Sequence, residues 1–393
     1  MKSLNRNTLA IYVATLFSYQ MYIASSLLAS VQAWFPTVDS NLIVLFFSAP
    51  LLANAFMALA LSPAIGRINK KLLVVIGLAT IIAGGTLVVL LGGNSFAISL
   101  IGVIMCGLGN AATIAATNTL LVEMNPATAS TTVATNNAVG CLGSMILTAV
   151  AGVLASDGTW TRAYMLCFPC IITLALFLIL YRGSKVTVAA VESAVDTQPT
   201  TPNKIRNVGL FSTVVFVFLL ANFAAAAWNS NYSIYIMMEK GIGNTVQTGM
   251  MNTLSSLGGV LGGFLIAGIV IRKLKRWTVP VSVVLVATPC LAAAFGCTSI
   301  PVLYVCAFMF MMFYQPVYGE MSASAGKLFP GGGGISCITA MGGLGNFIGP
   351  YLVNFIGTFG DGTTRIKFWA GVVFVILAAL IAIPTMKKVQ NAD

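Results

Sequence analysis

The sequence is dominated by apolar runs of roughly 20 residues that recur along its whole length. A helix of about 20 apolar residues is long enough to cross the hydrocarbon core of a lipid bilayer. Charged residues make up only 7% of the chain, whereas soluble domains carry about a quarter, so the chain lacks the polar surface that a soluble fold needs. The pattern predicts an all-α integral membrane protein.

The apolar runs fall on either side of one polar stretch near the middle of the chain. This stretch contains Pro, Thr, Ser and charges of both signs, which is typical of a solvent-exposed tether. We therefore expect a first bundle over 1–181, a cytoplasmic linker over 182–207 and a second bundle over 208–393. Twelve transmembrane helices are predicted, six in each bundle, at about 8–33, 40–66, 72–92, 96–122, 131–155, 162–181, 208–236, 246–271, 278–297, 301–327, 335–357 and 366–386.

The positive charges alternate between the gaps that separate these runs. Every second gap, together with the termini, holds sixteen of the twenty Lys and Arg residues, and the other gaps hold only Arg162, Lys240, Arg365 and Lys367. Such an asymmetry follows the positive-inside rule, because cytoplasmic loops carry the excess of Lys and Arg. We expect a multi-pass protein of the cytoplasmic (inner) membrane, with lipid rather than nucleic acid as the partner of its positive charge and with both termini in the cytoplasm.

The two halves repeat each other. Three matched landmarks lie at nearly constant separations, which are 206 residues between Ser62 and Gly268, 204 between Pro126 and Pro330, and 202 between Gly140 and Gly342. Three similar separations over half a chain indicate a duplicated six-helix unit, related by an axis along the membrane normal.

On this architecture, and on the loop after the second helix, the chain resembles the major facilitator superfamily. That family's loop runs roughly Gly-x-x-x-Asp-Arg/Lys-x-Gly-x-Arg/Lys-Arg/Lys, and Arg67 and Lys71 match two of its basic positions. Gly66 stands in place of the aspartate, so the family's charge relay is incomplete here. Glu123 resembles the acidic end of the family's fourth helix. We expect a cytoplasmic gate formed by charged residues of both halves: Arg67, Lys71, Glu123, Arg272, Lys273 and Lys327.

The resemblance implies that helices 1, 4, 7 and 10 line a central cavity that binds a small-molecule substrate. Polar side chains are costly in hydrocarbon unless they face partners or water, so those on these four helices are expected to point inward. The alternative is that they form interhelical hydrogen bonds, which are common in membrane bundles. The candidate substrate-binding residues are Tyr19, Gln20, Asn110, Thr113, Thr117, Asn222, Trp228, Asn229, Tyr232, Tyr314, Gln315 and Tyr318.

Positive charge is missing from the interiors of the predicted helices. No Lys or Arg lies deep within one of them, and the chain has no His. Because a buried anion needs a guanidinium or ammonium partner, this argues against dianionic and phosphorylated solutes. A neutral, aromatic or cationic organic molecule fits better, while a monocarboxylate held by Asn and Tyr donors stays open. No nucleophile–base pair and no metal-ligand set is visible, so we expect neither an enzyme nor a cofactor.

Glu320 is the one acidic residue well inside a predicted helix. An ionised carboxylate there costs at least about 2.5 kcal/mol unless it is paired or protonated. One hypothesis makes it a proton-coupling residue of a symporter. The other makes it a gate residue tied to Lys327, which shares its stripe of the helix, or to the Arg272–Arg276 cluster.

Two departures from the superfamily's drug antiporters favour import or exchange over drug efflux. Val103 stands where those proteins carry an arginine, and Cys141 follows Gly140 where they carry proline. We therefore expect a monomeric secondary transporter that imports or exchanges its solute by alternating access. The alternatives are a drug or metabolite efflux antiporter, a carboxylate exchanger, and a transporter-like receptor that binds its ligand without moving it.

Overall fold

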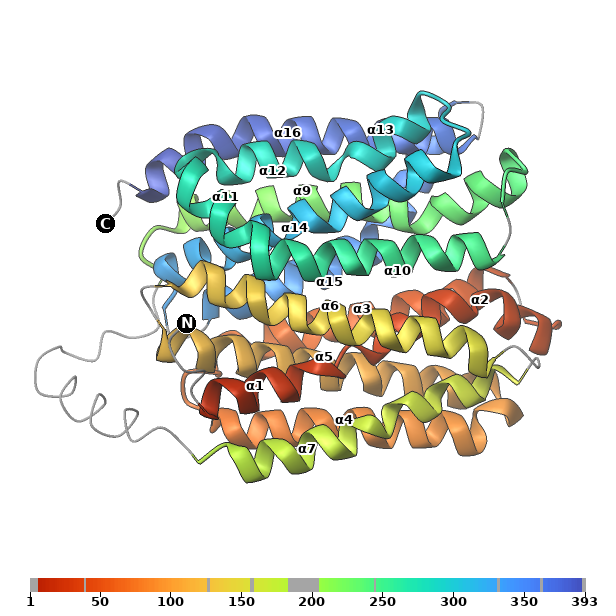
Figure 1. The fold of residues 1–393 in the computed structure, drawn as a ribbon, viewed down its shortest axis with the longest axis horizontal. Helices are drawn as coiled ribbons and strands as arrows, with labels where there is room; N and C mark the ends of the chain where they lie inside the picture. Colours follow the sequence, from red (N-terminus) through yellow and green to blue (C-terminus); the bar gives the residue numbers. More distant parts are fainter. Residues whose placement is uncertain are drawn as a thin grey trace, which may run out of the picture.

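The protein is a bundle of helices that run roughly parallel to one axis (Figure 1). The computed structural model describes residues 6–38, 40–125, 128–155, 159–182, 205–243, 245–330, 333–360 and 363–390. Within these ranges the secondary structure is helical and contains no strand. Most of the predicted linker, together with Pro126, lies outside the described residues.

Within the described residues, the first half contains seven α-helices and the second half contains eight. Those of the first half are α1 (Arg6–Leu16), α2 (Ile23–Trp34), α3 (Ser40–Leu61), α4 (Lys70–Leu91), α5 (Phe96–Met124), α6 (Ala129–Leu154) and α7 (Pro169–Leu180). Those of the second half are α9 (Val208–Ser233), α10 (Thr245–Leu261), α11 (Ala267–Leu274), α12 (Thr278–Val286), α13 (Thr288–Ala294), α14 (Ile300–Leu328), α15 (Gly333–Gly357) and α16 (Thr364–Gln390).

These helices join into twelve segments along the bundle axis within the described ranges. Short 3₁₀ or π turns link α1 to α2 and α10 to α11, while α13 follows α12 directly and a 3₁₀ turn over Trp160–Cys167 leads into α7. Eight described helices are long and apolar enough to cross a membrane, and the one spanning Gly249–Ala294 turns back on itself at Lys275. The twelve-helix prediction is confirmed, with shifts of a few residues at the ends.

The first segment differs from its prediction because it is broken in the middle. The sequence predicts one helix over 8–33, but α1 ends at Leu16 and helical structure resumes only with the turn Gln20–Tyr22. The break packs against α6, where Gly143 faces the carbonyl group of Leu16 so closely that a Cβ atom there would overlap it. Gly140, one turn earlier, faces the ring of Tyr19 in the same way. The broken backbone therefore fits against a glycine face of a neighbouring helix.

The apolar cores follow the two halves. One cluster of buried residues draws on positions between Ala10 and Tyr181. Two further clusters draw on positions between Leu210 and Val389, and Val133 of α6 is the one residue of the first half among their buried members. The halves meet most extensively through α3 against α15 and through α6 against α10 and α14.

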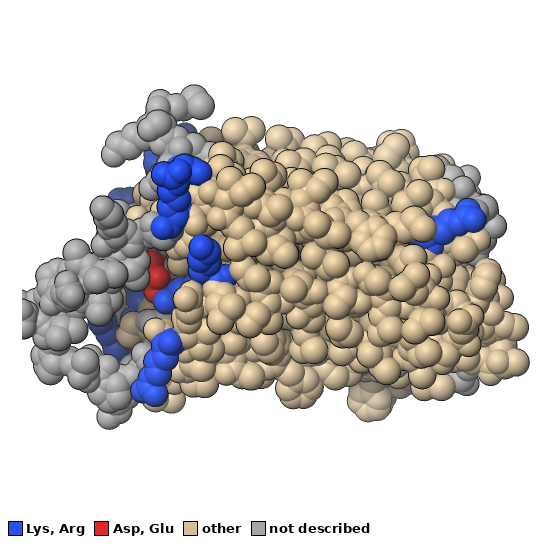
Figure 2. Space-filling view, turned by 90° about the horizontal axis from the view of Figure 1, so that it is seen from below, with Lys and Arg blue, Asp and Glu red and all other residues tan. Residues whose placement is uncertain are grey.

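The positive charge lies mainly at one end of the bundle. We call this the basic end and define it by Arg67, Lys70, Lys71, Arg182, Arg206, Arg272, Lys273, Lys275, Arg276, Lys327, Lys387 and Lys388. Helix α1 begins and helix α16 ends on this side (Figure 1), and Figure 2 shows a tan, uncharged belt between this end and a blue Lys or Arg side chain at the opposite end. This arrangement is the one that the alternating charges of the sequence predict.

Candidate functional site

A hydrogen-bonded chain connects the two halves near the middle of the bundle. The hydroxyl group of Tyr19 donates to Oδ1 of Asn137 at 2.6 Å, and Nδ2 of Asn137 donates to Oε1 of Gln315 at 2.8 Å. Gln315 lies roughly 20 Å from either end of α14, at 1.5 Å per residue. All three side chains are buried. Because Asn137 lies in α6 and Gln315 in α14, this chain crosses between the halves.

A second connection lies closer to the basic end. Nδ2 of Asn118 donates to the hydroxyl group of Tyr318 at 3.2 Å, and Asn136 supports Asn118 through a bond of 2.7 Å to its Oδ1. The Tyr318 hydroxyl also lies 3.4 Å from Oγ1 of Thr339 in α15. We call Tyr19, Asn118, Asn137, Gln315 and Tyr318 the inter-half network. Each of these residues is uncharged at neutral pH.

Further polar and aromatic groups of the second half lie beside Tyr318 of this network. Tyr314 donates its hydroxyl to Oδ1 of Asn222 at 3.0 Å, and the same oxygen accepts from Nδ2 of Asn346 at 3.2 Å. The rings of Tyr314 and Tyr318 are stacked, with centroids 6.4 Å apart, and Phe218 packs against both. Aromatic faces beside amide groups can hold apolar, hydroxyl-bearing or cationic parts of a solute.

Two of the predicted substrate-binding residues serve the broken first segment. Nδ2 of Asn110 donates to the carbonyl oxygen of Ser18 at 3.0 Å, and Nε2 of Gln20 donates to that of Phe17 at 3.1 Å. Backbone groups freed by a helix break inside a membrane need such partners, because hydrocarbon offers none. Nε2 of Gln20 also donates to the carbonyl oxygen of Leu166 at 2.7 Å, so for both residues the geometry matches the alternative of interhelical hydrogen bonding.

The remaining predicted residues are divided between helix contacts and the surface. Thr113 packs against Gly77 of α4, while Oγ1 of Thr117 accepts a hydrogen bond of 3.2 Å from Asn136. Trp228 stacks on Tyr232 and contacts Phe368, which places both inside a core cluster of the second half. The side chain of Asn229 is exposed. The structure thus gathers Tyr19, Asn222, Tyr314, Gln315 and Tyr318 from the candidate list around the inter-half contact.

At the basic end, Glu123 forms an ion pair with a residue that the family motif does not contain. Its Oε1 lies 3.0 Å from Nζ of Lys70. The side chain of Asn69 caps α4 by accepting from the backbone amides of Lys71 and Leu72, so Lys70 is the first residue of that helix. Arg67 lies in the exposed loop before this cap. The structure thus pairs Glu123 with Lys70, which the sequence analysis did not include among the gate residues.

Glu320 lies where α14 meets α6 of the other half. Its carboxylate is half-buried, interacts with the Ser130 hydroxyl and experiences the charge of Lys327 two turns along α14. Gly319, the preceding residue, packs against the backbone of Ser130. Arg272 and Lys273 lie exposed in the last turn of α11. Glu320 therefore lies at a contact between the two halves.

The asparagines that complete the inter-half network were not predicted from the sequence. Asn118 and Asn137 were not candidates, because Asn137 belongs to the fifth predicted helix and Asn118 lies on a different stripe of the fourth from Asn110. The consecutive pair Asn136 and Asn137 inside an apolar run was the available signal. Among the residues that the structure describes, no group of three or more His, Cys, Asp or Glu side chains is placed to hold a metal ion.

Comparison with known proteins identifies the family. The model of the Major Facilitator Superfamily matches residues 7–286 and again residues 217–391. The chain belongs to this superfamily. Its members are transporters, and the apolar helices described above agree with a multi-pass membrane protein. No curated protein sequence matches the chain.

Solved structures of similar fold cover nearly the whole chain. The human organic anion transporter MFSD10 is 13% identical with a TM-score of 0.74, covering 97% of this chain and 100% of its own. The xylose transporter XylE from E. coli is 14% identical with a TM-score of 0.69, covering 95% and 96%. The superfamily transporter FucP is 14% identical with a TM-score of 0.69, covering 96% and 98%. At these identities the likeness shows the fold alone.

Proposed function

We propose that this superfamily member is a secondary transporter that imports a small neutral organic solute by alternating access. The observation that carries the proposal is the inter-half network, because it joins two separately cored halves through uncharged hydrogen bonds in the middle of the bundle. A solute can reach the basic end only if the bonds between Asn137 and Gln315 and between Asn118 and Tyr318 break. The network is therefore assigned to the closed inner gate of the cycle.

The chemistry around the network favours a neutral solute. Tyr19, Asn222, Tyr314 and Gln315 offer hydroxyl and amide groups beside aromatic faces, whereas Lys and Arg side chains gather at the ends of the bundle. Hydroxyl and amide groups can exchange their mutual hydrogen bonds for bonds to a solute without burying a net charge. The xylose transporter of similar fold transports a neutral solute of this kind. Aromatic and cationic organic molecules fit the same groups.

A monocarboxylate exchanger is the second candidate. It is favoured by one observation, the organic anion transporter of similar fold. Amide donors such as Asn346 and Asn222 would then hold the carboxylate. The alternative in the direction of transport is a drug or metabolite efflux antiporter. The alternative from another class of protein is a receptor that binds its ligand without transporting it.

Proton coupling is assigned to Glu320. Its position between α14 and α6 means that closing the basic end changes its surroundings, as a coupling residue requires. Protonation would then be linked to opening of the gate, and the transporter would act as a symporter. The rival assignment is a purely structural tie to Lys327.

The proposed setting is the cytoplasmic membrane, with the basic end facing the cytoplasm and the protein acting as a monomer. The excess of Lys and Arg at that end supports this orientation. The same orientation places the proposed linker, over 182–207, in the cytoplasm.

Two assays in sequence test the proposal. A thermal unfolding screen of the purified protein against neutral, cationic and monoanionic solutes identifies binders, because a ligand of the folded state raises the unfolding midpoint. Counterflow in liposomes then measures exchange of each binder. Stabilisation and counterflow by neutral solutes support the proposal. Stabilisation by carboxylates alone would replace it with the exchanger, and binding without counterflow would replace it with the receptor.

A further inference from the structure

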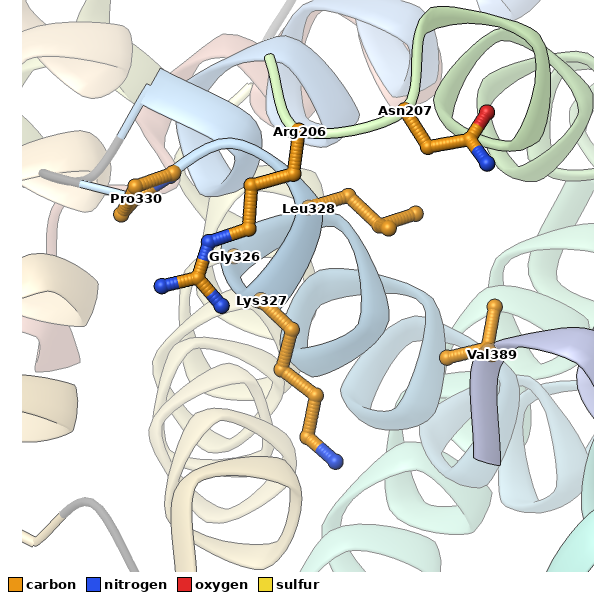
Figure 3. Close-up of a pocket in the computed structure, with 7 residues that line it drawn as sticks. All are labelled: Arg206, Asn207, Gly326, Lys327, Leu328, Pro330 and Val389. Carbon is orange, nitrogen blue, oxygen red and sulfur yellow. The ribbon is translucent and has the colours of Figure 1, made fainter. Parts of the chain in front are cut away.

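A cavity of about 390 Å³ opens at the basic end of the second half, away from the inter-half network (Figure 3). It lies among the first residues of α9, the last residues of α14 and the last turn of α16. Its lining combines two cations with apolar side chains and comprises Arg206, Asn207, Gly326, Lys327, Leu328, Pro330 and Val389.

The backbone fixes the position of the first cation. The amide of Arg206 donates to the carbonyl oxygen of Leu328 at 2.9 Å, which ties the residue before α9 to the end of α14. In Figure 3 the side chain of Arg206 extends toward the Gly326–Lys327 backbone, and both Arg206 and Lys327 extend away from Asn207. The Asn207 side chain caps α9 by accepting from the amide of Leu210. The cavity thus presents a guanidinium, an ammonium and the positive end of a 26-residue helix.

Among the residues that the structure describes, acidic side chains balance this charge only in part. Glu320 is the carboxylate whose interaction with Lys327 the structure shows, and it lies two turns back along α14. Lys387 and Lys388 precede Val389 in the last turn of α16 and add to the positive side. The cavity therefore favours an anion, and the Arg and Lys side chains that line it are of the types that proteins use to bind phosphate groups.

The apolar part of the lining distinguishes a lipid from a free ion. Leu328 and Val389 are buried in the core of the second half, but Pro330 is exposed, and a small hydrated phosphate would leave it uncovered whereas the glycerol and first acyl carbons of a phospholipid could pack on it. Val208, the residue after Asn207, is 63% exposed. Basic pockets between membrane helices at the cytoplasmic side are typical sites for anionic headgroups.

We infer that this cavity binds the phosphate group of an anionic phospholipid, held by Arg206 and Lys327. The inference rests on the proposed orientation, which puts the cavity at the level of the cytoplasmic headgroups. A bound lipid would join the ends of α9, α14 and α16, so it would stiffen the second half at the side where the two halves meet.

Native mass spectrometry of the full-length protein, released from a neutral detergent, tests the inference. Phosphatidylglycerol and phosphatidylcholine with the same acyl chains are titrated against the wild type, the double variant Arg206→Gln/Lys327→Gln and the control Arg272→Gln/Lys273→Gln. The control removes two cations of the same types from the same end but outside the cavity. We expect the affinity for phosphatidylglycerol to fall about 30-fold in the first variant and less than about 3-fold in the control, since each cation contributes about 1 kcal/mol at an anionic surface.

An equal loss in both double variants would overturn the site, because the charge of the whole end would then be responsible. Equal binding of the two lipids by the wild type would overturn it as well. Binding of a soluble anion in place of a lipid is tested on the wild type alone, by thermal unfolding with inorganic phosphate. Stabilisation by millimolar phosphate together with competition against phosphatidylglycerol would assign the cavity to a soluble anion and refute the lipid. None of these measurements depends on transport. The lipid site can therefore be refuted without refuting the proposed function, and the reverse also holds.

Discussion

Removing the amide of Asn137 should shift the protein toward the state that is open at the basic end. Asn137→Ala deletes the bond of 2.8 Å to Gln315, which exists only while the halves are closed there, and the bond to Tyr19 within the first half. Interhelical hydrogen bonds in membranes contribute about 0.6 kcal/mol on average and up to about 1.7 kcal/mol. The ratio of open to closed protein should therefore rise about 3- to 16-fold, at 1.4 kcal/mol per factor of ten.

Hydrogen–deuterium exchange of the purified protein measures this shift. Peptides from residues 129–141 of α6 and 333–345 of α15 cover the contact between the halves, and their amides gain access to water when the basic end opens. When opening and closing are fast, the exchange rate follows the open population, so these peptides should exchange about 3- to 16-fold faster, as estimated from the bond energy.

A matched control separates opening from general loosening. Asn231 is also buried, and its amide donates to Ala227 within α9 and to Ser230, with neither bond crossing between the halves. Asn231→Ala should leave exchange at the contact unchanged. Gln315→Ala should repeat part of the Asn137→Ala effect, and the double variant should fall short of the sum, because both changes delete the same bond. Unchanged exchange in Asn137→Ala, or an equal effect of Asn231→Ala, would refute the assignment of the network to the gate.

Two further predictions concern the broken segment and the carboxylate. Gly143→Ala should lower the thermal unfolding midpoint, because its new Cβ would overlap the Leu16 carbonyl and overpacking costs about 1–3 kcal/mol. The control Gly268→Ala should leave the midpoint unchanged, since its Cβ would meet a Thr131 methyl at an ordinary 3.6 Å. Equal midpoints for the two variants would contradict the close packing of Gly143 on the broken segment. Glu320→Gln should abolish accumulation of the solute driven by a pH gradient while sparing counterflow. Both are measured in liposomes with the solute that the screen identifies. Retained accumulation would rule out the proton role and leave the structural tie to Lys327.

Hydropathy was sufficient to predict the twelve segments, because a membrane imposes a minimum length on every apolar helix. It was not sufficient for the break after Leu16. Residues 17–19 are Phe, Ser and Tyr, and none of them stops a helix by itself. The break packs against Gly140 and Gly143, which lie more than a hundred residues away in the sequence, so only the packed structure reveals it.

The candidate site was predicted in part for a similar reason. Polar residues in apolar runs point inward, and Tyr19, Gln315 and Tyr318 do meet at the contact between the halves. Polarity alone does not say which partner a side chain finds, however. Asn110 was a candidate to face a solute, and its amide binds the Ser18 carbonyl. The broken helix leaves backbone carbonyl groups that need hydrogen-bond donors, and the break is not evident from the sequence.

The neutral composition of the inter-half network has a consequence for the electrical behaviour of the transporter. Moving one elementary charge across the membrane potential changes the free energy by about 2.3 kcal/mol per 100 mV. Tyr19, Asn118, Asn137, Gln315 and Tyr318 carry no net charge, so rearranging them transfers none across the membrane. Any current or voltage dependence of the transport cycle then reports on the solute itself or on a proton carried by Glu320, and not on the opening of the network.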